Sequence, residues 1–312
     1  LLGISCLFDR KATRIIVKSR ENMTDKSFGI LLAVTAGILW STIGLSIKSI
    51  EQANVFEILF YRSIFISIFI GLLLHFFFRF NFLNFLKNWV SYFVGGTALF
   101  FAYIGGIYAL LTTSAANALL LFACAPIFTA ILSPILLRET ISLRTIMSIL
   151  IAFLGVLIMV WSDFGAGDWK GNLSAVISAL GFSFFTINLR INKHLQMLPS
   201  VFSSGIISSL VAFLIILVSN YSFQLIERDF MIIFILGVFQ VGGGLVLYTL
   251  GSKFVPATQL TILMLGEVFL GPVWVWIFIG EEVLYNTILG GSLICFAVLY
   301  NALYSSSEKL IK

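Results

Sequence analysis

Charged residues are scarce in this sequence of 312 residues: Asp, Glu, Lys and Arg make up only 11%, whereas 60% of the residues are hydrophobic. A water-soluble globular domain carries about 25% charged residues, so this chain has too little polar surface to be dissolved in water. Two stretches, residues 88–137 and 195–226, contain no charged side chain at all. The composition therefore predicts a protein whose solvent is lipid.

The chain also has few of the residues that build metal sites and disulfide frameworks. It contains 2 His and 3 Cys, and Cys6, Cys124 and Cys295 have no second Cys or His at the spacing of metal ligands. No Walker sequence occurs, so ATP drive is not supported. We predict no cofactor and no metal. Lys and Arg collected in cytoplasmic loops explain the net charge of +5, so we predict no nucleic-acid partner.

What the sequence has in abundance is long apolar segments. In lipid every backbone polar group must be satisfied internally, which leaves helices or closed barrels. The uncharged stretches are far longer than the roughly 10 residues of a barrel strand, so they predict helical hairpins. At about 20 residues per span, clusters of turn and charged residues divide the chain into about ten predicted spans: 28–48, 55–77, 89–110, 114–137, 143–161, 171–190, 198–219, 229–250, 255–279 and 284–304.

Lys and Arg lie mostly on one side of this predicted topology. Of the 19 such residues, 15 fall in the N-terminal segment, the even-numbered connections and the C-terminal tail, 3 fall in the odd-numbered connections, and Arg62 lies within a span. Cytoplasmic loops are enriched in Lys and Arg. We therefore predict that both termini of this multi-pass protein lie in the cytoplasm.

The sequence contains an internal repeat, because residues 142 positions apart resemble each other. Ser41 corresponds to Ser183, and Glu139 to Glu281. Two halves of five spans follow, and an odd number of spans inverts the second half relative to the first. The predicted fold class is therefore an all-α membrane protein with about ten transmembrane helices arranged as two inverted five-helix repeats, a construction typical of secondary transporters.

The predicted organisation has four parts. Residues 1–27 form a basic cytoplasmic segment that we expect to be disordered, residues 28–161 the first repeat, residues 171–304 the second repeat, and residues 305–312 a cytoplasmic tail. A full-length span follows the basic segment directly, so we expect no signal-peptide cleavage. Met23 is a candidate for the natural start.

Motifs distributed over residues 28–304 make the chain similar to the EamA family of the drug/metabolite transporter superfamily. They stand in the family's order and at the repeat spacing: Trp40-Ser41, Phe60-Tyr61-Arg62, the stretch 113–118, Pro126, Leu137-Arg138-Glu139, Val255-Pro256-Ala257-Thr258, the run 266–274 with its Gly266-Glu267-Val268 and Pro272-Val273-Trp274, and Gly280-Glu281. The two halves have diverged, since Pro126 has no proline counterpart at 268 and Arg62 is matched by Ser204.

This resemblance implies ten helices in two inverted repeats and transport of small metabolites, often amino acids or related solutes, across a bacterial inner membrane. Export is the common direction in the family. The expected partners are a small-molecule substrate and the lipid bilayer, and proton coupling is a further hypothesis.

Glu267 is the foremost candidate site residue. It lies about 12 residues into a predicted span, or roughly 18 Å, which is close to the middle of a hydrocarbon core about 30 Å thick. Burying the ion there costs on the order of 3 kcal/mol. We expect the carboxyl group to be paired, to face a watery cavity or to be protonated. A glutamate at this depth predicts a site that couples transport to protons or binds an amine of the substrate. The structural alternative is a hydrogen bond between helices.

Arg62 is the second candidate. It lies about 7 residues into its span, with Glu57 as the nearest charge on the same segment. A guanidinium group binds a carboxylate through two parallel hydrogen bonds, which favours contact with substrate. Snorkelling to the headgroups, or a fixed ion pair with Glu267, are the alternatives.

The uncharged candidates share an amide, hydroxyl or aromatic group within an apolar span. They are Trp40, Ser41, Asn117, Gln240, Tyr248 and Trp274. Each could line a substrate cavity, and helix packing or an interhelical hydrogen bond is the structural alternative for each.

Two classes of function remain. The first is a secondary transporter without enzymatic activity. The alternative is an intramembrane enzyme acting on a lipid or isoprenoid, but such enzymes cluster His, Asp or Glu for metal or acid–base chemistry. Here the two histidines, His75 and His194, lie near predicted cytoplasmic loops. A channel would not explain the duplication.

Overall fold

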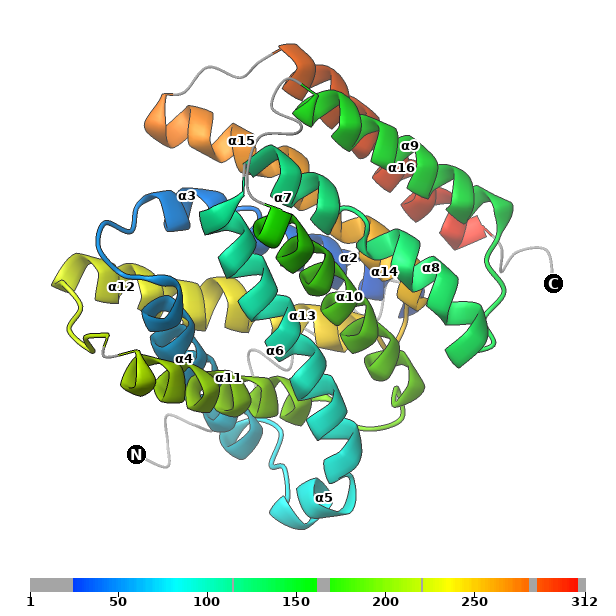
Figure 1. Ribbon diagram of the computed structural model, residues 1–312. Coiled ribbons are helices and arrows are strands. Elements are labelled where there is room, and N and C mark those ends of the chain that lie inside the picture. Colours follow the sequence, from blue (N-terminus) through cyan, green and yellow to red (C-terminus); the bar gives the residue numbers. More distant parts are fainter. Residues whose placement is uncertain (1–24, 114, 162–168, 220, 281–284, 308–312) are drawn as a thin grey trace, which may run out of the picture.

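The computed structural model of the protein describes residues 25–113, 115–161, 169–219, 221–280 and 285–307. The elements in these ranges are all helices (Figure 1): α2 (Asp25–Trp40), α3 (Ile43–Lys48), α4 (Val55–Phe76), α5 (Phe82–Lys87), α6 (Trp89–Thr112), α7 (Ala115–Phe122), α8 (Ala125–Leu136), α9 (Leu143–Val160), α10 (Trp169–Ile191), α11 (Leu198–Val218), α12 (Glu227–Ile235), the π-helix η1 (Leu236–Gly243), α13 (Gly244–Gly251), α14 (Ala257–Met264), α15 (Gly266–Ile279) and α16 (Tyr285–Ser307).

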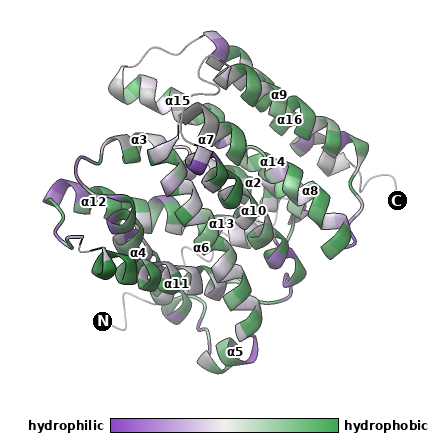
Figure 2. Ribbon diagram, viewed as in Figure 1, coloured by the Kyte–Doolittle hydropathy of each residue, from purple (hydrophilic) through white to green (hydrophobic). Residues whose placement is uncertain are grey.

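Seven helical segments in the described part are long and apolar enough to cross a membrane. They begin at residues 25, 55, 89, 169, 198, 227 and 257, and three shorter apolar helices cover 120–136, 143–158 and 288–302. Figure 2 shows hydrophobic residues along the length of these helices, with hydrophilic residues mostly near their ends and in the connections. Many large apolar side chains are exposed, among them Leu143, Ile135 and Leu214. The expectation of an all-helical membrane fold is confirmed.

Local sequence explains where individual helices begin. Asn54 accepts hydrogen bonds from the backbone N–H groups of Phe56 and Glu57, and the Glu57 carboxylate accepts one from the Asn54 N–H. This reciprocal pair is a capping box, and it satisfies N–H groups that the first turn of a helix leaves open. It also explains Glu57, whose carboxylate is engaged at the start of α4 and does not reach towards Arg62.

Helices that correspond at the spacing of 142 residues pack against each other. Counterparts α4 and α11 lie side by side at one edge of the molecule, and counterparts α9 and α16 at another (Figure 1). The chains of α4 and α11 run in opposite directions: Phe60 near the start of α4 stacks on Phe213 late in α11, whereas Gly71 late in α4 lies against Phe202 early in α11.

The structure differs from the prediction in four of the spans: three are interrupted, and the eighth is a continuous helix with a π-helical segment inside it. The first is divided into α2 and α3 at Ser41–Thr42, the fourth into α7 and α8, and the ninth into α14 and α15, whereas the eighth consists of α12, η1 and α13. The breaks after α7 and α14 stand at corresponding positions of the two halves. A hydropathy profile reports the length of an apolar segment and not its backbone conformation, so it could not predict these changes within a span. The short helix α5, in the connection before α6, was not predicted either.

Candidate functional site

Trp40, the last residue of α2, lies at the centre of an aromatic cluster. Its ring centroid is 5.7 Å from that of Phe182 on α10 and 5.4 Å from that of Tyr248 on α13. Position 244 in α13 must be glycine, because a Cβ atom there would collide with the indole. The indole Nε1 is buried and has no hydrogen-bond partner, so a donor is available within the cluster.

Tyr248 is completely buried, and its hydroxyl shares a hydrogen bond of 2.7 Å with the Thr186 hydroxyl of α10. This bond satisfies the one polar group of a side chain that otherwise packs on aromatic rings. It also fixes the ring that supports Trp40. Tyr248 therefore positions the cluster, and its own hydroxyl is already engaged.

The break between α2 and α3 provides the next contact. The Ser41 hydroxyl donates to the Ile38 carbonyl over 2.6 Å and accepts a hydrogen bond of 2.7 Å from the Trp274 indole of α15. Residues 233 positions apart are thereby joined. Trp274 is thus held by an interhelical hydrogen bond, the structural alternative given for it above.

Gln240 lies in the π-helix η1 and is 4% exposed. Its amide nitrogen donates to the Trp40 carbonyl over 3.3 Å, while its amide oxygen is buried without a partner. π-Helical segments widen the hydrogen-bonded turn and occur often at functional sites. An unsatisfied acceptor on Gln240 thus lies in the same cluster as the unsatisfied donor on Trp40.

Glu267 lies in the first turn of α15, directly after the break at Leu265. It is within electrostatic reach of Tyr248. Neither an ion pair nor a hydrogen bond joins its carboxyl group to the other described side chains. The start of a helix carries partial positive charge, which favours a carboxylate. The prediction placed Glu267 inside a continuous span, and the structure corrects this detail: Glu267 occupies the N-terminus of a half-helix.

Arg62 lies apart from this cluster, on α4. Its guanidinium carbon is 4.7 Å from the centroid of the Tyr103 ring of α6. The residue is 3% exposed, and its Nε and Nη2 atoms have no acceptor. Neither the ion pair with Glu267 nor snorkelling to the surface describes this position.

The structure therefore brings five predicted residues together, namely Trp40, Ser41, Gln240, Tyr248 and Trp274, with Glu267 nearby. Asn117 lies on α7, but its side chain is outside the described residues, as are Ser114, Glu281, the segment 1–24 and the tail from 308. Sequence reasoning did not select Phe182, Thr186 or Tyr103. One signal was present for Phe182, which stands 142 positions after Trp40.

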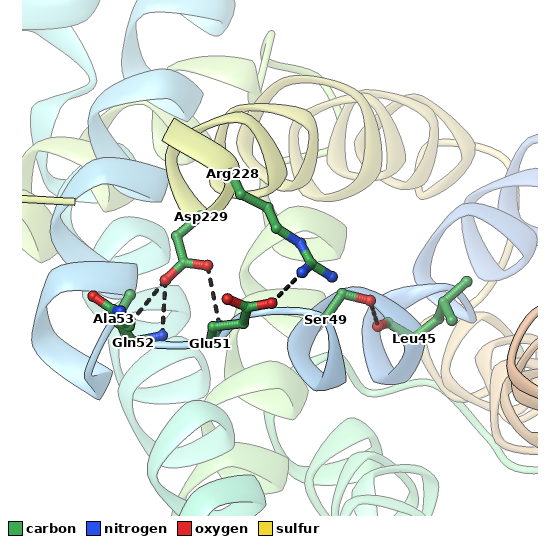
Figure 3. A network of polar contacts seen from close by, with 7 residues as sticks. All are labelled: Leu45, Ser49, Glu51, Gln52, Ala53, Arg228 and Asp229. Atoms are coloured by element: carbon green, nitrogen blue, oxygen red, sulfur yellow. Dashed lines mark hydrogen bonds and ion pairs between the residues drawn. The ribbon is translucent and has the colours of Figure 1, made fainter. Parts of the chain in front are cut away.

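Two polar networks hold opposite ends of the helices. In the first, Asp229 at the start of α12 is fully buried, and its carboxylate accepts the backbone N–H groups of Glu51, Gln52 and Ala53 at 3.0, 2.9 and 3.0 Å (Figure 3). Arg228 pairs with the Glu51 side chain beside it, as Figure 3 shows. This network binds the α3–α4 connection to α12.

The second network joins three segments around Arg190, near the end of α10. Its Nε atom donates to the Glu139 carboxylate over 2.7 Å, and Nη1 donates to the Lys253 carbonyl over 3.3 Å. Burial lowers the pKa of the Lys253 ammonium group. Arg190 is thus the ion-pair partner of Glu139.

Comparisons with known proteins agree with this architecture. The family described as the EamA-like transporter family matches the chain twice, over residues 27–161 and 169–303. A crystal structure of another protein is similar over 89% of this chain and 99% of the other, with a TM-score of 0.74 and 19% identity, which speaks for the fold alone. No curated protein matches the chain. The family match favours a transporter over the intramembrane enzyme.

Proposed function

The chain belongs to the EamA-like transporter family, and from that premise we propose that it is a secondary transporter of small metabolites, amino acids or related solutes. It exports them across a bacterial inner membrane by alternating access around a cavity near the midplane. Membership of this family supports transport of small solutes across a membrane. The substrate class, the direction of transport and the coupling ion are proposals.

The proposed architecture has ten transmembrane segments in two inverted repeats, with both termini in the cytoplasm. Seven long and three shorter apolar helices support it, in the order that the sequence predicts. The antiparallel packing of the counterparts α4 and α11 supports the inversion. A single cysteine placed in the 140–143 connection should be labelled only from the cytoplasm, and one in the 281–284 connection only from outside. Labelling of both from one side would exclude the inverted arrangement.

The observation that carries the proposed site is the meeting of interrupted helices around Trp40. The α2–α3 break, the π-helix η1 and the α14–α15 break are held together by the bonds of Ser41 and Gln240. Broken helices near the middle of a membrane are tolerated where they line a cavity, and their ends present backbone charge to a substrate. The proposed lining residues are Trp40, Ser41, Asn117, Gln240, Tyr248 and Trp274, together with Arg62 and Glu267.

Glu267 is the proposed coupling group. A carboxyl group moves between two access states more easily when it is neutral, because the ion would lose its solvation during the change. The protonated form would therefore make the transition, and the ion would form when the cavity opens to water. The networks of Asp229 and of Arg190 lie at opposite helix ends, so we propose that they close the outer and the inner side.

The test uses purified protein in proteoliposomes, with a panel of radiolabelled amino acids and metabolites. Glu267→Gln keeps the size of the side chain and fixes it in the neutral form. We expect transport driven by a pH gradient to disappear and substrate exchange at equal pH to survive. Glu227→Gln is the matched control, because Glu227 also lies in the first turn of a helix but is exposed.

Three results are distinguishable. Loss of both activities in a folded variant would assign Glu267 to substrate contact or helix packing. Wild-type rates for both would remove it from the coupling mechanism. If the wild-type protein moves no member of the panel in either direction, transport of small metabolites itself is contradicted.

A further inference from the structure

Arg62 is a buried cation that the protein itself does not neutralise. It is 3% exposed, its Nε and Nη2 atoms have no acceptor, and among the described residues no carboxylate lies within ion-pair distance of it. The nearest acidic residue on its own helix, Glu57, is bound to the Asn54 N–H. The guanidinium therefore has hydrogen-bond donors directed at no protein group.

The contact with Tyr103 does not offset the cost of burying this charge. A cation over an aromatic ring gains about 2 kcal/mol when both are desolvated, whereas the effective penalty for burying an ion is several kcal/mol. Tyr103 adds a buried hydroxyl, which lies near the Ser204 side chain but forms no well-aligned hydrogen bond to it. The Arg62 guanidinium and the neighbouring Tyr103 hydroxyl are thus two donors that could bind an acceptor from a ligand.

The position of Arg62 in the duplicated fold is also informative. Ser63 and Gly205 are counterparts at the repeat spacing, and they touch: a Cβ atom at position 205 would lie 2.8 Å from the Ser63 carbonyl oxygen. This contact places Ser63 where the two halves meet, and transporters built from inverted repeats bind substrate between their halves near the membrane midplane. Arg62 is next to this contact, and its own counterpart is the fully buried Ser204. Of this counterpart pair, only position 62 carries a charged side chain.

We propose that Arg62 and Tyr103 bind the carboxylate of the transported solute. This inference rests on the proposed function and narrows its substrate class to solutes with a carboxylate. The guanidinium fork would hold both carboxylate oxygens, and the Tyr103 hydroxyl would donate a further hydrogen bond to one of them. An acid and its amide differ in this group alone, so they are the appropriate probes.

The experiment compares L-leucine, L-phenylalanine and L-threonine with the corresponding amino-acid amides. Two readouts are used: the shift in melting temperature of the purified protein, since a ligand of the folded state stabilises it, and exchange in proteoliposomes. Arg62→Gln removes the charge. Tyr103→Phe removes only the hydroxyl and keeps the ring under the guanidinium. Arg79→Gln is the matched control, because Arg79 is exposed just beyond the end of α4.

We expect at least one acid to stabilise and exchange in the wild type more strongly than its amide. In Arg62→Gln its apparent affinity should fall about tenfold to a hundredfold, the range for losing charge-assisted hydrogen bonds. Tyr103→Phe should weaken the same acid by a smaller factor, and Arg79→Gln should leave it unchanged. Affinity for the amides should be the same in all four proteins.

The contrary results separate this inference from the proposed function. Exchange of acids and amides with equal affinity, or an equal effect of Arg62→Gln on both, overturns the carboxylate site and leaves transport intact. Absence of exchange for every probe, with a folded wild-type protein, contradicts the carboxylate site, and extension of the assay to neutral and cationic metabolites then decides whether transport itself stands. If Arg62→Gln does not fold, Tyr103→Phe decides, because it preserves the charge and the ring.

Discussion

The residues of the cluster around Trp40 and the residues 142 positions away from them differ in almost every polar group. Shifted by 142 residues, Trp40, Gln240, Tyr248, Glu267 and Trp274 correspond to Phe182, Ala98, Gly106, Ala125 and Leu132. Only the serine is kept, as Ser41 and Ser183. Ser183 is fully buried, and its hydroxyl is shared between the carbonyls of Ala179 and Ala125 at 2.8 and 2.9 Å.

This difference indicates that corresponding positions of the duplicated fold serve different purposes, helix packing at one set and ligand contact at the other. Around Ser183 the small residues let helices meet closely: a Cβ atom at Gly181 would lie 2.7 Å from the Ala98 carbonyl oxygen. Around Ser41 the same layout carries larger polar and aromatic residues, with buried groups left unsatisfied on Trp40 and Gln240. The positions around Ser183 provide close helix packing, and the positions around Ser41 carry the groups that could contact a ligand. Three pairs of substitutions at counterpart positions test this division.

A glutamate at Ala125, the counterpart of Glu267, should have the largest effect on stability. Ala125 is 7% exposed and begins α8 against α10. We expect Ala125→Glu to lower the free energy of unfolding by about 3 kcal/mol or more, because an ion or a larger side chain has to enter packed apolar surroundings. Glu267→Ala should change it far less. Unfolding in detergent titrations measures both, and an Ala125→Glu protein as stable as the wild type would contradict the division.

The second test compares Asp229 with its counterpart Lys87. Asp229 is fully buried and accepts three backbone N–H groups, whereas Lys87 is exposed at the end of α5. Asp229→Ala should cost about 2 kcal/mol or more, because it leaves buried donors without an acceptor. Lys87→Ala should stay within about 0.5 kcal/mol of the wild type. Similar melting temperatures for the two variants would show that the outer network does not hold the helices.

The serines should give the smallest change in stability and the sharpest functional contrast. Ser183→Ala removes a hydrogen bond between α10 and α8 and should cost about 1 kcal/mol with transport unchanged. Ser41→Ala removes the acceptor of the Trp274 indole, so we expect a similar loss of stability together with a several-fold lower rate of exchange. Equal transport by the two variants would argue against a functional role for the Trp40 cluster.

The sequence pattern selected Trp40, Ser41, Gln240, Tyr248 and Trp274 because each is a polar or aromatic residue within an apolar segment. The structure brings these five residues together, and their role in binding stays a prediction. The sequence analysis did not select Tyr103, because its contact with Arg62 arises only when α6 packs against α4. It offered a pair of Arg62 with Glu267 that the structure does not contain, since proximity along the membrane normal says nothing about position within the membrane plane.

The amino-acid sequence by itself determined that this chain folds in lipid, as helices and in two related halves, because burial of apolar residues and the repeat spacing are properties of composition and order. Only the tertiary structure decided where the spans break, as at Leu265, and which side chains meet. Asp229 and the 51–53 backbone, or Ser41 and Trp274, are more than 170 residues apart in the chain. Contacts at such separation arise when whole helices pack, and no local pattern encodes which faces do so.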